Sequence, residues 1–182
     1  MSLTYAVEVL KKIDVSRLID VADLIYKKAY ANGGTVYVAG VGGSAFTASH
    51  FSADIYKYAS DGVLDSISLT DNISTVTAIT NDLGWDKLFT YQLTFANKQD
   101  VLVAFSVHGG TKEFSGNLTE AFLQAKKKKM PTVSFTGHDG GEIKKLSTIN
   151  VNVNSKSTPI IEGIHSLLAH IVVEHLKKRI NQ

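Results

Sequence analysis

The sequence predicts an α/β fold in which a five-stranded parallel sheet is flanked by helices, in a three-layer, flavodoxin-like arrangement with additional N-terminal helices. Two observations support this prediction. Short apolar runs rich in β-branched residues alternate along the chain with segments whose apolar side chains recur at helical spacing. Two of these runs, at 35–39 and 101–105, end in loops of glycine and hydroxyl residues. Ligands bind at the carboxyl ends of the strands in parallel sheets of this kind.

The elements follow in a simple order. Helical spacing from residue 4 to residue 32 predicts N-terminal helices, which we expect across one end of the sheet or against a second subunit. Strands are expected at 35–39, 65–69, 101–105, 132–136 and 150–153. Helices are expected at 73–79 and 85–96, then after Thr111 to about 128, in a short turn up to 146, and from about 157 to 179. The chain is predicted to be one domain, with N-terminal helices at 1–34 and an α/β core at 35–182.

Composition restricts the classes of protein. The 182 residues are 44% hydrophobic and 20% charged, enough for one domain with a sizeable core. A net charge of +2 gives no general attraction for nucleic acid or anionic membrane, and the lysines at 126–129 fall at a predicted helix end, where cations favour the helix dipole. Cysteine is absent, which excludes disulfides and thiolate metal sites. With no signal-peptide pattern and no long apolar run, we expect a soluble, cytoplasmic protein.

The turn after the first strand has the features of an anion site. Gly40, Gly42 and Gly43 permit a tight turn and close approach of backbone to a ligand. Ser44 stands at the expected N-cap of the next helix, where free N–H groups, the helix dipole and a hydroxyl converge. The alternative is an ordinary tight connection from strand to helix. The spacing matches neither the dinucleotide fingerprint nor a Walker loop.

The helix that follows carries His50 and Asp54 four residues apart, on one face, so that they can share a metal or a proton. A histidine on a helix is more often structural, and that alternative stays open. The second loop, SVHGGT at 106–111, repeats the design of the first loop after another buried strand. Because both loops are expected at strand carboxyl ends, they can converge on one site.

Four segments together resemble one family. VYVAGVGGSAFTASHFSADI, LTDNISTVTAITNDLGW, DVLVAFSVHGGTKE and STPIIEGIHSLLAHIVVEHL occur in the order and spacing of the sugar isomerase (SIS) domain family. Within that family the chain resembles the phosphoheptose isomerases, over about residues 15–178. The resemblance implies five parallel strands flanked by helices, and homodimers or homotetramers with active sites at subunit interfaces.

The resemblance also implies a reaction and a set of site residues. Phosphoheptose isomerases interconvert sedoheptulose 7-phosphate and D-glycero-D-manno-heptose 7-phosphate, an aldose–ketose isomerisation. The implied catalytic residues are Asp54 and His170, and the implied ligands of a zinc or similar cation are His50, Asp54, Glu162 and His170. The implied substrate-binding and phosphate-binding residues are Gly42, Gly43, Ser44, Asp82, Ser106, His108 and Thr111.

Several positions depart from the family pattern. Asp54 replaces a glutamate, Glu162 replaces a glutamine, and Val41 replaces an asparagine. His108 lies in SVHGGT where the family has Ser-Thr-Ser-Gly-Asn-Ser, and it is expected to contact phosphate, to act as an acid or base, or to face solvent. Two alternatives therefore stand beside the phosphoheptose reaction: a non-catalytic phosphosugar-binding module, and an isomerase for another sugar phosphate such as a hexulose 6-phosphate.

Two further histidines on the last helix, His165 and His175, lie five residues before and after His170. At that spacing they point away from the direction of His170. They are expected to be structural or exposed.

Overall fold

The computed structural model describes residues 2–111 and 113–182, and it contains the expected parallel sheet. Its strands are ordered β2-β1-β3-β4-β5, and every neighbouring pair is parallel. Val38 of β1 is in register with Ser68 of β2 and with Val103 of β3. The strand order reverses between β1 and β3, so the switch point lies where the two glycine loops begin. The strands are β1 (Val36–Ala39), β2 (Ser66–Ser68), β3 (Val101–Ser106), β4 (Thr132–Gly137) and β5 (Ile149–Val153).

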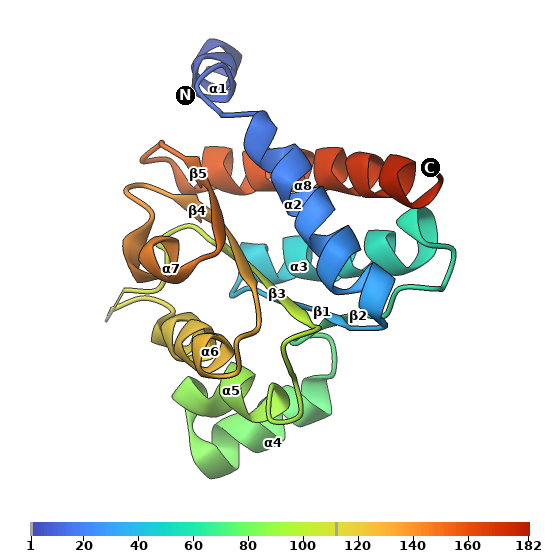
Figure 1. Ribbon diagram of the computed structural model, residues 1–182. Coiled ribbons are helices and arrows are strands. Elements are labelled where there is room, and N and C mark those ends of the chain that lie inside the picture. The colour runs from blue at the N-terminus through green and yellow to red at the C-terminus, as the bar shows by residue number, and fades with distance from the viewer. Residues whose placement is uncertain (1, 112) are drawn as a thin grey trace.

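Helices cover both faces of this sheet, as predicted (Figure 1). Helices α2, α3 and α8 pack on one face, and α4, α5, α6 and α7 on the other. The helices are α1 (Leu3–Leu10), α2 (Ser16–Lys28), α3 (Gly43–Ala53), α4 (Ile73–Leu83), α5 (Leu88–Gln92), α6 (Gly116–Lys127), α7 (Gly141–Leu146) and α8 (Thr158–Ile180). Short 3-10 turns lie at Tyr30–Asn32 and Trp85–Lys87, and a π-helical segment, Asp54–Ala59, continues α3.

The central strand β3 shows why the strands read as continuous apolar runs. Val101, Val103 and Phe105 belong to the core under α2, α3 and α8. Leu102 and Ala104 belong to the core under α5, α6 and α7. Side chains alternate between the two faces of a strand, and here both faces are covered, so each position is buried. Burying a large apolar side chain contributes about 1.5–3 kcal/mol.

The expectation that the N-terminal helices lie across one end of the sheet was wrong for α2. The helix packs against α8 and β5 on one face of the sheet, because Leu18, Val21, Ala22 and Ile25 form a buried stripe at helical spacing. Helix α1 projects beyond the body of the domain (Figure 1). The Tyr5 hydroxyl nevertheless lies 2.9 Å from Ser155 Oγ.

The helix expected at 85–96 is shorter than predicted. A 3-10 turn leads into α5, which ends at Gln92. The carbonyls beyond that end have side-chain partners: Lys128 Nζ donates to the carbonyls of Thr94 and Ala96, at 2.7 and 3.0 Å. Local periodicity cannot reveal this long-range capping. Among the described residues, none of the helices has the length and apolar character that a membrane crossing requires.

Candidate active site

The turn between β1 and α3 is formed by closely packed backbone. Gly42 has φ of +63°, and a Cβ on Gly40 would lie only 2.3 Å from the Ser44 carbonyl oxygen. Glycine is therefore required at both positions. The helix begins at Gly43 with Gly42 as its N-cap, so the expectation that Ser44 is the cap was wrong by two residues. Ser44 instead lies buried in the first turn of the helix.

The two glycine loops converge on a cleft of about 310 Å³, as expected; we call it the inner cleft. Loop 41–44 and residues 106–108 line it together with the residues before α6 and the start of α8. Hydroxyl groups and the first turn of α3 supply neutral donors to it, and the carboxylates of Glu113 and Glu162 also line it. Neutral donors at a helix N-terminus can hold a phosphate dianion without a basic patch. The residues that line the inner cleft include Gly42, Ser44, Ser106, His108, Ser115 and Glu162.

The hydroxyl residues of the second loop have separate positions. Ser106 lines the inner cleft, and its Oγ accepts from the Gly109 N–H at 3.0 Å. Thr111 Oγ1 accepts from the Phe114 N–H at 3.1 Å and lines a larger neighbouring cavity instead.

Ser115 is a residue of this cleft that the sequence reasoning missed. It is the left-handed N-cap of α6, with φ of +57°, and its side chain makes no capping hydrogen bond. The length of the second loop could have indicated this residue. The family loop has its last serine five residues after its first, whereas Ser115 follows Ser106 by nine. The intervening residues make the loop longer and carry Ser115 to the position facing the cleft.

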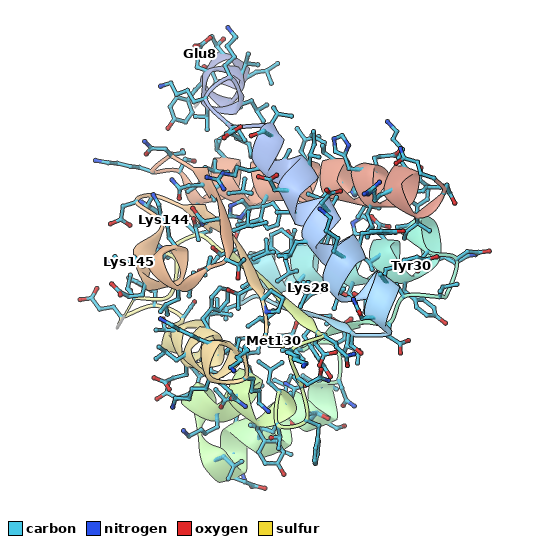
Figure 2. All side chains as sticks on the ribbon, viewed as in Figure 1. Glu8, Lys28, Tyr30, Met130, Lys144 and Lys145 are labelled. Carbon is cyan, nitrogen blue, oxygen red and sulfur yellow. The ribbon has the colours of Figure 1, made fainter. Side chains whose placement is uncertain are left out.

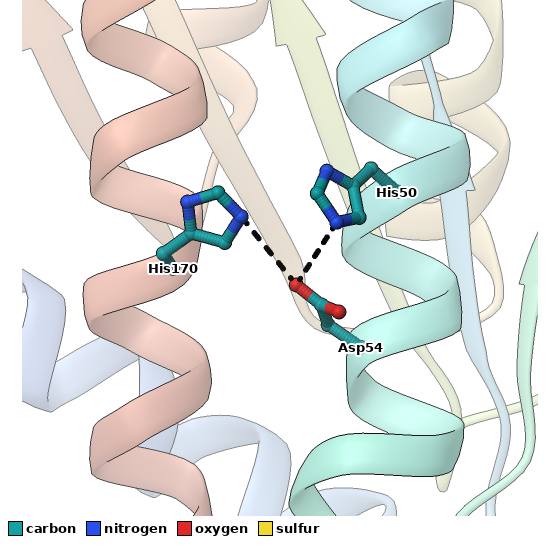
Figure 3. Close-up of side chains that lie close together, drawn as sticks. All are labelled: His50, Asp54 and His170. Atoms are coloured by element: carbon teal, nitrogen blue, oxygen red, sulfur yellow. Dashed lines mark ion pairs between the residues drawn. The ribbon is translucent and has the colours of Figure 1, made fainter.

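A cluster of His50, Asp54 and His170 lies where α3 and α8 pack together (Figure 3). Asp54 Oδ2 is 3.6 Å from Nε2 of both histidines. The two imidazole rings are 5.0 Å apart, nearly perpendicular. The spacing of four residues that predicted His50 and Asp54 on one helix face is confirmed, because α3 remains α-helical as far as Ala53.

This cluster fits a metal ion. One ligand atom from each of the three residues lies within 4.8 Å of the others. Two imidazole nitrogens and a carboxylate oxygen are a common catalytic zinc set, with a fourth position open for water or substrate. The histidine side chains are about half exposed, at 48%, so that such a position is reachable from solvent.

Glu162 is not part of this cluster. Its carboxylate lies against Gly43, where a Cβ would be 2.5 Å from Oε1, and it lines the inner cleft. Asp82 lies near the end of α4, exposed and outside the inner cleft, with Oδ1 accepting from Asn81 Nδ2 at 2.8 Å. The structure thus places the expected residues in the histidine cluster and in the inner cleft, except for Thr111, which lines the neighbouring cavity, and Asp82, which lines neither hollow.

His165 and His175 differ in their surroundings. His165 is 1% exposed and packs against Phe105 and Phe135, at ring distances of 6.1 and 6.3 Å. Burial lowers the pKa of His165 to about 4, and the neighbouring Thr136 backbone offsets only part of that effect. Neither ring nitrogen has a well-oriented partner among the described residues. His165 is therefore a neutral core residue, as expected. His175 lines a surface pocket with α2.

The strand order and the cleft at the switch point define the class: a parallel α/β domain with a small-ligand cleft at its strand ends. The SIS domain family model matches residues 3–137. The chain belongs to the SIS domain family and, within it, to the phosphoheptose isomerases. It is 42% identical over 151 residues to the phosphoheptose isomerase of Burkholderia pseudomallei strain 1710b, covering 80% of this chain and 75% of that protein.

Two further relatives agree. The phosphoheptose isomerase of Helicobacter pylori strain P12 is 38% identical over 151 residues, which cover 81% of this chain and 76% of that protein. The structure of phosphoheptose isomerase from Neisseria gonorrhoeae superposes with a TM-score of 0.86 at 30% identity, covering 96% of this chain and 94% of that one. The likeness therefore extends over the whole fold, including α8 with His170.

Proposed function

We propose that this protein is an aldose–ketose isomerase for a seven-carbon sugar phosphate, interconverting sedoheptulose 7-phosphate and D-glycero-D-manno-heptose 7-phosphate. The observation that carries the proposal is the pairing of an anion cleft with an acid/base cluster on the same two helices. Ser44 and His50 both lie on α3, six residues apart, and Glu162 and His170 both lie on α8, eight residues apart. Membership of the phosphoheptose isomerases supports the choice of sugar.

The phosphate would bind in the inner cleft, held by the hydroxyls of Ser44, Ser106 and Ser115 and by N–H groups of the first turn of α3. His108 faces the same cleft and would add a donor. A phosphate anchored there fixes one end of the open-chain sugar and leaves the carbonyl end free to reach along α3 and α8. Anchoring of this kind converts a proton transfer into an intramolecular step.

The proton transfer would use Asp54 and His170. Isomerisation moves a proton between C1 and C2 through an enediol, with a second proton moving between the oxygens. Asp54 Oδ2 faces both histidines, while the other carboxylate oxygen points away from them (Figure 3). That second oxygen is the candidate to take the carbon-bound proton. In the cluster without a metal, His170 Nε2 would serve the sugar oxygens; with zinc held by His50, Asp54 and His170, the ion would instead supply polarisation of those oxygens.

The test is an isomerisation assay on the zinc-loaded protein with sedoheptulose 7-phosphate and, separately, hexulose 6-phosphates, in deuterated water. We expect turnover of the heptulose, deuterium at the transferred position, and at least a roughly hundredfold loss in Asp54→Asn and in His170→Gln. Binding measured by calorimetry should survive in both variants. Sugar binding without turnover or exchange would contradict catalysis and leave a phosphosugar-binding module. Turnover of the hexulose alone would establish the other isomerase.

We also propose that the protein works as a homo-oligomer. Asp82 is expected from the family resemblance to contact substrate, yet it lies outside the inner cleft of its own chain. A second copy could supply an Asp82 to this cleft. Light scattering coupled to gel filtration would measure the assembly, and Asp82→Asn should then lower turnover without changing the mass. A catalytically active monomer would contradict this.

A further inference from the structure

A second and larger cavity of about 810 Å³ adjoins the inner cleft; we call it the outer cavity. It lies where β4 and β5 end, and its lining includes His108, Phe114, His138, Lys144, Asn152 and Lys156. His108, Glu113 and Phe114 line both hollows, so these residues lie between them. Its size is within the range of small-molecule sites. The proposed isomerisation gives it no task.

The wall between the two hollows is a stack of three rings. His108 lies between Phe114 and His138, with ring centroids 4.5 Å and 4.9 Å away and interplanar angles of 23° and 18°. The backbone of His138 is held as well, because its N–H donates to the Ser155 carbonyl and its carbonyl accepts from Asn152 Nδ2 at 3.1 Å. The stacked rings therefore hold His108 as a partition between the two hollows. It does not turn to solvent, which was one of the three roles that the sequence left open for it.

The outer cavity contains cations that lack a carboxylate partner among the residues the structure describes. Lys144 Nζ donates to the backbone carbonyl of Asp139 at 3.2 Å, and Lys156 forms no ion pair within the described chain. Lys144 and Lys145 both project from α7 (Figure 2). Lys145 is paired with Glu142 at 3.0 Å. The contrast between neighbouring lysines marks Lys144 as the one available to a ligand.

Two acids, Glu113 and Asp139, share this lining, but neither forms an ion pair with the two lysines within the described residues. The Asp139 carboxylate accepts from the Gly141 N–H at 3.1 Å, within its own turn. Glu113 is exposed at the mouth shared with the inner cleft. Neither forms an ion pair within the described residues. The imidazoles of His108 and His138 likewise have no carboxylate partner there, in contrast to His50 and His170. Two ammonium groups and the His108 imidazole thus offer donors to an oxyanion in this cavity, while Nε2 of His138 is buried.

We propose that the outer cavity is a second oxyanion subsite, so that the protein binds sugars with an anionic group at each end. One phosphate would lie in the inner cleft, and a second phosphate or a carboxylate would lie between Lys144 and Lys156 across the His108 partition. Such a ligand would compete with the monophosphate substrate, because both occupy the inner cleft. This inference rests on the proposed function for the inner cleft alone.

The experiment compares sedoheptulose 7-phosphate, sedoheptulose 1,7-bisphosphate and a phosphorylated sugar acid by calorimetry on the intact chain. We expect at least about tenfold tighter binding of the bisphosphate than of the monophosphate. The double variant Lys144→Gln/Lys156→Gln should reduce this advantage to less than about threefold, while its monophosphate affinity and turnover stay unchanged. Lys145→Gln is the matched control and should keep the full advantage. The sugar acid shows whether a carboxylate can replace the second phosphate.

Equal affinity for the mono- and bisphosphate in the wild type, or an advantage that persists in the double variant, would overturn the subsite. If the monophosphate does not bind at all, the proposed function of the inner cleft fails instead. The outer cavity is then tested with inorganic phosphate. Phosphate binding that falls in the double variant supports the subsite, and phosphate binding that is absent or unchanged overturns it.

Discussion

At the scale of single residues, hydroxyl groups rather than cations define the inner cleft. Ser44, Ser106 and Ser115 face it, and none of the described lysines or arginines lines it. A dianion bound there would depend on a few directed hydrogen bonds, each of which contributes more than a neutral one because the acceptor is charged. The contribution of each serine should therefore be measurable singly.

We predict that Ser44→Ala and Ser115→Ala each weaken sugar phosphate binding by about 1.5–3 kcal/mol, or ten- to a hundredfold. Thr111→Ala is the comparison, because Thr111 faces the outer cavity and bonds its own loop. It should change monophosphate affinity less than the serine variants do. Titration calorimetry measures all three, with thermal unfolding as the control for stability. If Thr111→Ala weakened binding more than Ser115→Ala, the phosphate would depend on Thr111 rather than on Ser115, contrary to this prediction.

A second residue-scale prediction concerns stability and pH. The pKa of His165 falls from 6.5 to about 4 on folding, so between these values the unfolded chain binds a proton that the folded chain does not. Stability is then fully present above pH 6.5 and is lost as the pH falls towards 4. The loss is on the order of 3 kcal/mol.

Urea unfolding from pH 7.5 to 4.5 would measure this effect in the wild type and in His165→Leu. The wild type should lose stability more steeply than the variant, since leucine carries no proton. Parallel pH profiles would show that other groups cause the acid sensitivity.

The sequence predicted the pairs of residues whose positions depend on local spacing. His50 and Asp54 meet because four residues make about one helical turn. The sequence did not indicate Ser115 as a site residue, because its role depends on the path of a loop that is longer than the family pattern. The separation of Glu162 from the histidine cluster was contained in local spacing, because eight residues of one helix place it about 12 Å along the axis from His170.

At the scale of elements, the connection from β1 to α3 illustrates how a helix start is held. We predict that Gly40→Ala destabilises the protein by at least about 1–3 kcal/mol, because its Cβ would meet the Ser44 carbonyl, which is backbone and cannot move aside. Gly163→Ala is the matched control. Gly163 is exposed in α8, and a Cβ added there would have no neighbouring atom within 4 Å, so alanine should stabilise the helix by up to about 1 kcal/mol. Denaturant unfolding of both variants would measure the change in the free energy of unfolding. A Gly40→Ala variant as stable as the wild type would contradict the close packing at this turn.

The packing of α3 against α8 brings the metal ligands together, and this yields another prediction. We expect about one zinc per chain after loading and dialysis, and loss of that zinc in His50→Ala and in His170→Ala. Glu162→Gln should retain it, because Glu162 lies at Gly43 rather than in the cluster. Elemental analysis gives the stoichiometry. Zinc loss in Glu162→Gln equal to that in the histidine variants would return Glu162 to the ligand set.

At the scale of the whole molecule, the alternation of strands and helices was sufficient to predict the sheet and its covering layers. Every expected strand is present. The inner strands β3 and β4 are buried at every position and so read as apolar runs, whereas the edge strands β2 and β5 keep partly exposed positions. The errors lie where contacts distant in sequence decide. Lys128 binds the backbone carbonyls that follow α5, where a longer helix was expected. Helix α2 packs against α8 and β5 rather than across an end of the sheet.

Under the proposed function, the same architecture would set how far the phosphate lies from the reacting carbons. Six residues of α3 separate Ser44 from His50, and an α-helix rises about 1.5 Å per residue, giving about 9 Å. An extended chain advances about 1.2 Å per bond. From C2 to phosphorus, a heptulose 7-phosphate spans about 8 Å, a hexulose 6-phosphate about 7 Å and a pentulose 5-phosphate about 6 Å by the same measure.

We therefore predict that kcat/KM falls with each carbon removed, by about a hundredfold for each ångström of misplacement. Measuring the three ketose phosphates under identical zinc loading tests this, with inorganic phosphate as a competitive inhibitor to confirm that all three use one anchor. Asp54→Glu extends the carboxylate by one methylene and should shift the preference towards the shorter sugar if reach is limiting. Equal kcat/KM for all three sugars, or a preference that Asp54→Glu leaves untouched, would show that the distance along α3 does not select the substrate.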